Sequence, residues 1–356
     1  MEDDIVYNAA AHCNAEEFKK ILLDHLHLID ATVDDNTPMH NAASHGNVDA
    51  IKILMKYGST SIDKVNDMNE TPIYIAAVRH HIDAIKELVK LGCTTINTPD
   101  VQLLTPLHHA TDNIDTFRCL MEHGAQDSMN TGENDDLTPL HFAIQKGNLD
   151  VAQILIDAGC DIDLCDSLVY CEGETAVHYA AHTGDVNALM LFYNHHPQLI
   201  NIVGAHRRTL MHTAAFHNRS NIIELIVRLG SNNINAVDNF GNSALHSTDQ
   251  CHSILGSAIE TLVKMGFRML EHENCGGYRP LDMLLHSAEF DGEVSGIKVL
   301  RALGVEDSKH IANRNYNIAI KEEEVLEIRR RCYFKRSLMD ILCCEIMLHD
   351  LKYQMT

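Results

Sequence analysis

The sequence predicts an all-α solenoid of stacked helix-turn-helix units that are joined by β-hairpin loops. The main observation is a short motif that recurs along the chain as TPMH, TPIY, TPLH, TPLH, TAVH, TLMH and SALH. Its first residues are Thr37, Thr71, Thr105, Thr138, Thr175, Thr209 and Ser243, at intervals of 34, 34, 33, 37, 34 and 34 residues. Such a period is typical of repeat proteins, in which each unit packs only against its neighbours.

Within each unit, the residue types predict a first helix. The motif Thr is a capping residue, and the Pro that follows it suits the first helical position, where no amide donor is needed. The small pair Ala42-Ala43 allows neighbouring helices to approach closely. Gly46 suits the left-handed backbone that ends a helix. The His that ends the motif is expected to satisfy backbone groups near the start of this helix.

A second helix is expected to follow, with its apolar residues on one face. Its capping residues are predicted at Asn47, Asn148, Asp185 and Asn221. Its buried leucines are predicted at Leu54, Leu88, Leu155 and Leu225. A loop rich in Asp and Asn comes next, and these residues are suited to turns.

Long segments of the chain resemble the ankyrin repeat family. Residues 36–58 read NTPMHNAASHGNVDAIKILMKYG, and residues 136–159 and 208–230 carry the same pattern. The resemblance covers residues 4–305 and implies nine repeats, of which the first and last are atypical. It implies an ankyrin repeat domain at residues 1–305 and a helical carboxy-terminal segment at residues 306–356.

The resemblance also implies a function in protein recognition, without chemistry of its own. Proteins of this family bind partners through the concave face of the first helices and through the hairpin tips. By register, the concave positions that we expect to bind a partner are Phe142, Gln145, Lys146, Tyr179, His182, Thr213, Phe216 and His217, and the tip positions are Arg207, Arg208 and Phe240. Exposed aromatic rings often dominate binding energy. Because an ordinary histidine titrates near pH 6.5, binding through His182 and His217 is expected to depend on pH.

Composition favours a protein partner over nucleic acid or membrane. The chain has 28 Lys and Arg against 50 Asp and Glu, a formal charge of −22, which opposes binding to phosphate backbones. No apolar run approaches the roughly 18 residues of a membrane-spanning helix, and no secretory signal is recognisable at the amino terminus. The 11 cysteines suggest reduced thiols. We expect a monomer in the cytoplasm or nucleus.

No catalytic or cofactor signature is present. The motifs GxSxG, GxxxxGK, GxGxxG and HExxH are all absent from the sequence. Cys160, Cys165 and Cys171, with His178 beyond them, are spaced more widely than the ligands of zinc sites. We therefore expect no enzymatic activity, no cofactor and no metal.

The carboxy-terminal segment leaves the repeat pattern and has two interpretations. In one, two short helices fold back and cover the last repeat. In the other, the segment recruits a ubiquitin ligase, because Ser337-Leu338 followed by Leu342 and Ile346 resembles an Elongin-binding helix. Leu342 stands where that family has a small residue, which puts this likeness in doubt. Pathogen host-range factors and effectors share the same architecture, so that origin stays open.

Overall fold

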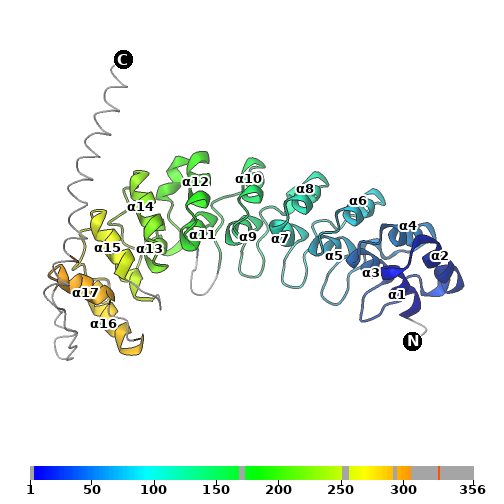
Figure 1. Cartoon of the computed structure of the whole chain (residues 1–356), viewed down its shortest axis with the longest axis horizontal. Helices are drawn as coiled ribbons and strands as arrows, with labels where there is room; N and C mark the ends of the chain where they lie inside the picture. Colours follow the sequence, from blue (N-terminus) through cyan, green and yellow to red (C-terminus); the bar gives the residue numbers. More distant parts are fainter. Residues whose placement is uncertain (1–3, 168–172, 251–255, 292–294, 306–327, 329–356) are drawn as a thin grey trace, which may run out of the picture. The chain divides into compact units, whose positions relative to one another are not determined.

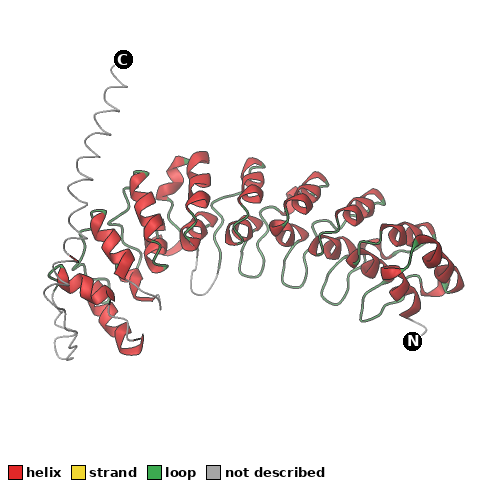
Figure 2. Cartoon of the chain, in the orientation of Figure 1, coloured by secondary structure: helices red, strands yellow, loops and turns green. Residues whose placement is uncertain are grey.

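The computed structural model describes residues 4–167, 173–250, 256–291, 295–305 and 328. Over these residues the chain consists of helices joined by loops, with no strand (Figure 2). Extended pairing in the same part of the chain is limited to isolated bridges at Val33–Asn36, Cys165–Thr175, Val203–Thr209 and Val237–Ser243. The predicted all-α solenoid is confirmed, and its hairpins are tight turns.

The chain forms two compact units, residues 1–176 and 177–356. In the first unit the helices are α1 (Asp4–His12), α2 (Ala15–Asp24), α3 (Pro38–Ser44), α4 (Val48–Lys56), α5 (Pro72–Val78), α6 (Ile82–Lys90), α7 (Pro106–His109), α8 (Ile114–Glu122), α9 (Pro139–Gln145) and α10 (Leu149–Asp157). Short 3-10 turns lie at Leu26–Leu28, Ser61–Asp63, Ala110–Asp112 and Ala125–Ser128. Helix α11 (Ala176–Thr183) begins at the boundary between the units.

The second unit continues the same alternation. Its described helices are α12 (Val186–His195), α13 (Leu210–Phe216), α14 (Ser220–Arg228), α15 (Gly256–Lys264), α16 (Pro280–Asp291) and α17 (Ser295–Ala302). The 3-10 turns lie at Pro197–Asn201, Ala205–Arg207 and, as η7, at His246–Gln250, where a first helix would otherwise stand. None of the helices in the described parts of the chain is long and apolar enough to cross a membrane.

Two rows of helices build the first unit (Figure 1). The first helices α1, α3, α5, α7 and α9 contact one another in series, and the second helices α2, α4, α6, α8 and α10 form a parallel series. The core lies between the rows. Leu54, Leu88 and Leu155 are fully buried in it, as predicted, at the same distance after each motif Thr.

Two register assignments in α14 were wrong. Leu225 is only partly buried, whereas Ile226 occupies the register of the core leucines and is buried. The residue before α14 is Arg219, and Asn221 lies inside the helix, where its Nδ2 donates to the Gly184 carbonyl (2.8 Å). Both positions were predicted from residue type. The spacing from the motif Thr in the other repeats, applied to Thr209, gives Arg219 and Ile226 instead.

Motif histidines link each repeat to the next, which confirms their expected structural role. The Thr37 N–H donates to Nδ1 of His40 (3.1 Å), and Nε2 of His40 reaches the carbonyl of Glu70 in the following loop (3.1 Å). His108 makes the same pair of contacts. In the second unit, His212 does so as well.

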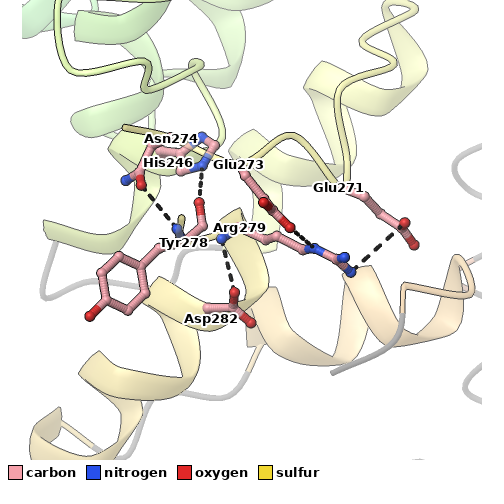
Figure 3. A network of polar contacts seen from close by, with 7 residues as sticks. All are labelled: His246, Glu271, Glu273, Asn274, Tyr278, Arg279 and Asp282. Carbon is pink, nitrogen blue, oxygen red and sulfur yellow. Dashed lines mark hydrogen bonds and ion pairs between the residues drawn. The ribbon is translucent and has the colours of Figure 1, made fainter. Parts of the chain in front are cut away.

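The last repeat replaces this histidine with a carboxylate (Figure 3). The Arg279 N–H donates to Oδ2 of Asp282 (2.9 Å), so Asp282 caps α16 in the manner of the motif His. His246 from the preceding repeat contacts the Tyr278 carbonyl (3.0 Å). Glu271 and Glu273 lie around the Arg279 guanidinium. The unusual RPLD sequence therefore preserves the cap.

The expected carboxy-terminal segment at residues 306–356 lies outside the described residues, apart from Ile328, whose side chain is buried. The positions proposed for a ligase box, Ser337, Leu338, Leu342 and Ile346, all fall there. Its role therefore stays a prediction.

Candidate functional site

A hollow opens on the first-helix face of the first unit, the face formed by α1, α3, α5, α7 and α9. Its volume is about 220 Å³, and it is lined by Tyr7, Asn36, His40, Asn41, Ser44, Glu70, Ile75, Val78 and Arg79. The floor is polar and fixed, since Asn41 donates to the Tyr7 carbonyl (2.8 Å). Arg79 is exposed at its edge. The hollow suits a polar side chain of a partner.

Phe142, Gln145 and Lys146 lie further along the same face. The ring of Phe142 is half-buried and packs edge-on against His108 of the preceding repeat, with 5.3 Å between the ring centroids. Lys146 is exposed, lies 5.8 Å from the centroid of the Phe142 ring and pairs with Asp112 (3.8 Å). Gln145 is exposed. The Phe142 ring thus packs partly against the preceding repeat and is partly exposed to solvent.

In the second unit, His182 and His217 form a parallel ring stack. Their centroids lie 3.6 Å apart with 5° between the planes. Phe216 meets His217 edge-on (4.7 Å), and Arg219 holds the stack by donating from Nε to the His182 carbonyl (2.7 Å). Phe216, His182 and His217 are all half-buried. The arrangement is a rigid aromatic surface formed by side chains of two repeats.

The expectation that this pair makes binding pH-sensitive is wrong near neutral pH. Burial, followed by the neighbouring His182, Arg219 and Arg208 charges, lowers the pKa of His217 to about 3. Burial and Arg219 also lower the pKa of His182. Both rings are therefore neutral at physiological pH, which allows them to stack.

Two expected surface residues are inside the fold. Tyr179 is 4% exposed and Thr213 is 2% exposed, and both occupy the fourth position after the motif Thr. Phe142 occupies the same position after Thr138 but is half-buried, so burial at this position differs from repeat to repeat. Phe216 instead lies seven positions after its Thr and does not share the register of Phe142 and Tyr179.

The tip residues of the second unit are accessible. Arg207 is exposed, Arg208 is partly so, and Phe240 is 54% exposed beside the His206 ring, with centroids 5.6 Å apart. The Asn239 N–H donates to the His206 carbonyl (2.8 Å), which fixes these neighbouring loops to each other.

Each loop tip has a left-handed residue two positions before the motif. These residues are Asp35, Asn69, Leu103, Asp136, Gly173, Arg207, Gly241 and Gly277, with φ between 59° and 82°. Gly, Asn and Asp tolerate this backbone, whereas other residues are strained in it. Leu103 and Arg207 are the two exceptions in this set. Sequence analysis overlooked Leu103, although alignment by register would have identified it.

Relief of this strain is measurable. We expect Leu103→Asn to raise the free energy of unfolding by up to about 1 kcal/mol relative to Leu103→Ala, because both remove the same apolar atoms but Asn tolerates the left-handed region. Urea denaturation of the three proteins gives the difference. An Asn variant no more stable than the Ala variant would show that the Leu103 backbone is unstrained.

No metal-binding arrangement is visible among the described residues: no three His, Cys, Asp or Glu side chains are grouped as ligands. The described cysteines Cys13, Cys93, Cys119, Cys160 and Cys275 are free thiols. Cys171 of the expected cluster lies outside the described residues.

Comparisons with known proteins fit this repeat architecture. The family model for ankyrin repeats matches three times, at residues 6–100, 95–166 and 158–238. Mouse inversin is 26% identical over 167 residues, which is 45% of this chain but only 16% of inversin. The mouse B-cell lymphoma 3 protein homolog is 30% identical over 239 residues, covering 65% of this chain and 44% of that protein. Pig NF-kappa-B inhibitor alpha is 30% identical over 108 residues, 29% of this chain and 33% of that protein.

The fold has a counterpart among solved structures. The crystal structure of the human ASB11 ankyrin repeat domain superposes with a TM-score of 0.53 at 22% identity and covers 65% of this chain and 98% of that domain. At this identity the likeness shows the fold alone. The family-model matches extend over well more than half of the sequence. The chain belongs to the ankyrin repeat family.

Proposed function

We propose that the chain binds a protein partner through the aromatic surface and loop tips of its second unit, and that the first-helix face of its first unit is a separate binding surface. Ankyrin repeats are protein-protein interaction modules that generally lack catalytic activity. One of the similar proteins, NF-kappa-B inhibitor alpha, carries a protein target in its name. The observation that supports our choice of surface most is the stack of His182 and His217 beside Phe216.

The physical basis is preorganisation. Neutral stacked rings carry no charge that must be desolvated when a partner docks, and Arg219 fixes the backbone of His182 through its carbonyl. A rigid surface loses little conformational entropy when a partner docks. Arg207, Arg208 and Phe240 at the tips, and Gln145 and Lys146 in the first unit, supply polar and apolar contacts that can select the partner.

The test compares partner capture by the full chain with capture by the variant Phe216→Ala, Phe240→Ala. Affinity purification with quantitative mass spectrometry should recover at least tenfold less partner with the variant, because both rings are accessible. Its thermal melting should stay close to that of the unaltered chain. Tyr179→Ala serves as the control for packing: it should lower the melting temperature. A folded double variant that captures the same partners at equal yield would remove this surface from consideration.

The proposal includes a monomer in the cytoplasm or nucleus that does not bind nucleic acid. The formal charge of −22 and the free thiols of Cys13, Cys93, Cys119, Cys160 and Cys275 support this setting.

A ligase adaptor is the second candidate, supported by the likeness at Ser337–Ile346 in the sequence. A chain that ends at Gly304 separates the two functions. Loss of Elongin from the captured proteins, with other partners kept, would support the adaptor.

A further inference from the structure

Negative charge is concentrated in the first unit. Residues 1–176 contain 10 Lys and Arg against 30 Asp and Glu, whereas residues 177–356 contain 18 against 20. Nearly all of the net charge of −22 therefore belongs to the first unit. Such asymmetry creates a field that attracts basic partners to one part of the chain.

Exposed apolar side chains gather on two adjacent loop tips of this same unit. They are Val65, Met68, Val101 and Leu103, at 41%, 48%, 50% and 47% exposure, and we call them the apolar tip surface. The loops before α5 and α7 supply two of these residues each. The Val101 N–H donates to the Met68 carbonyl (3.0 Å), and Asn69 Nδ2 donates to the Pro99 carbonyl (2.6 Å). The surface is therefore held together by hydrogen bonds between its two loops.

Acidic tips border the apolar tip surface on both sides. Asp34 and Asp35 are exposed on the loop before α3, which is joined to the next loop by Asn66 Nδ2 donating to Asn36 Oδ1 (3.0 Å). Asp135 and Asp136 are exposed on the loop before α9. That loop is linked by the Asn134 N–H donating to the Gln102 carbonyl (3.2 Å).

Within the described residues, none of these four carboxylates forms an ion pair with Lys, Arg or His. The loops that carry them project on the same side of the first unit (Figure 1). The order along the unit is therefore acidic, apolar and acidic.

Leu103 is the residue that the fold itself explains least. Its backbone lies at φ 64°, in a position where the other repeats of the first unit have Asp35, Asn69 and Asp136. Its side chain also leaves nearly half of its surface in water. Strained, exposed residues of this kind cluster at binding sites, where a partner supplies the missing contacts.

We propose that the apolar tip surface binds a protein segment with apolar residues at its centre and Lys or Arg on both sides. The apolar centre covers Leu103, Val101 and Met68, and the basic flanks face the carboxylates on the two bordering loops. Charge complementarity sets the orientation and speeds association, while apolar burial supplies affinity. The proposal rests on the proposed role in protein recognition and states which kind of partner segment this surface binds.

The experiment selects ligands from a random peptide library displayed on phage, with the folded full chain as the target. Selected peptides should carry apolar residues between Lys or Arg. Binding of the synthetic peptides should weaken at least tenfold in the variant Leu103→Asn, Val101→Thr. In Asp35→Asn, Asp136→Asn, binding should weaken and become less dependent on salt, since two of the four bordering carboxylates are neutralised without a change of shape. Asn also tolerates the left-handed backbone at both of these positions.

Val203→Thr is the matched control for Val101→Thr, because Val203 is an exposed valine on a loop of the second unit, as Val101 is in the first. It should leave peptide binding unchanged. Thermal melting of each variant shows that binding loss is not unfolding, and Leu103→Asn should not melt earlier than the unaltered chain.

Three results would overturn the proposal. The first is selected peptides without basic residues. The second is equal binding of the peptides by the unaltered chain and by Leu103→Asn, Val101→Thr, which excludes the apolar tip surface and leaves the proposed function intact. The third is failure of a synthetic peptide of residues 329–336, RRRCYFKR, to displace the selected peptides, because this sequence has the proposed apolar centre and basic flanks.

Discussion

Acid should unfold the first unit well above the pH at which its carboxylates titrate. Burial holds the pKa of His40, His108 and His141 at about 4, below the ordinary value of 6.5. Because the folded-state pKa is the lower one, the stabilisation is complete above pH 6.5 and is lost as the pH falls from 6.5 towards 4. Each histidine contributes a slope of about 1.4 kcal/mol per pH unit, so three approach about 4 kcal/mol per unit in the steepest part.

The hydrogen bonds explain why the neutral form is required. Nδ1 of His141 accepts from the Thr138 N–H (3.1 Å), so the ring proton is on Nε2, which reaches the Glu174 carbonyl (3.3 Å). A second proton on Nδ1 would face a donor, and the resulting charge would be buried. Protonation therefore breaks the cap and buries a charge, although Nε2 can still donate to the Glu174 carbonyl.

Urea denaturation at pH 7, 6 and 5, followed by circular dichroism, measures this slope. A parallel series in high salt is the control, because protonation also reduces repulsion among the acidic residues of this unit, and salt screens that opposing effect. In His141→Gln the slope of the free energy of unfolding against pH should fall by about 1.4 kcal/mol per pH unit, the contribution of one histidine. The variant should also be less stable at pH 7. A free energy of unfolding that is constant from pH 7 to pH 5 would contradict the prediction.

The fold could be predicted from the sequence because its information is local and repeated. A Thr-Pro cap, an Ala pair and a capping Asn each act over a few residues, and the motif period sets their stacking. Even RPLD at the last repeat keeps the cap, since Asp282 accepts the same backbone bond as a His. The capping residue and the core leucine of α14 were assigned wrongly, to Asn221 and Leu225, because residue type was followed where the spacing from the motif Thr gives other residues.

The candidate surfaces were harder to predict because exposure depends on neighbouring repeats. Tyr179 and Phe216 are both aromatic residues on first helices, yet one is buried and the other is partly exposed. The ring stack of His182 and His217 joins residues from two repeats, and its lowered pKa values follow from burial that no single sequence window shows. Leu103 was overlooked because its unusual feature is a backbone angle, which the sequence shows only indirectly, through the Asp, Asn or Gly at the same register in most other repeats.

Truncation of one core leucine should produce a large but local loss of stability. Leu88 is fully buried in α6, which contacts α4 and α8. We expect Leu88→Ala to lower the free energy of unfolding by about 2–5 kcal/mol, through lost burial and the cavity left behind. In a stack where each repeat contacts only its neighbours, the damage should remain in the adjoining repeats.

Hydrogen exchange resolves this distribution, since amides of α4, α6 and α8 should lose protection while those of α2 retain most of theirs. Leu225→Ala is the comparison, because Leu225 is only partly buried and its truncation should cost less than Leu88→Ala. The contrast matters more than either value, because both variants remove the same atoms from a second helix and differ in burial. Equal losses in the two variants would contradict the dependence on burial, and uniform loss of protection across the unit after Leu88→Ala would mean that its repeats unfold as one block.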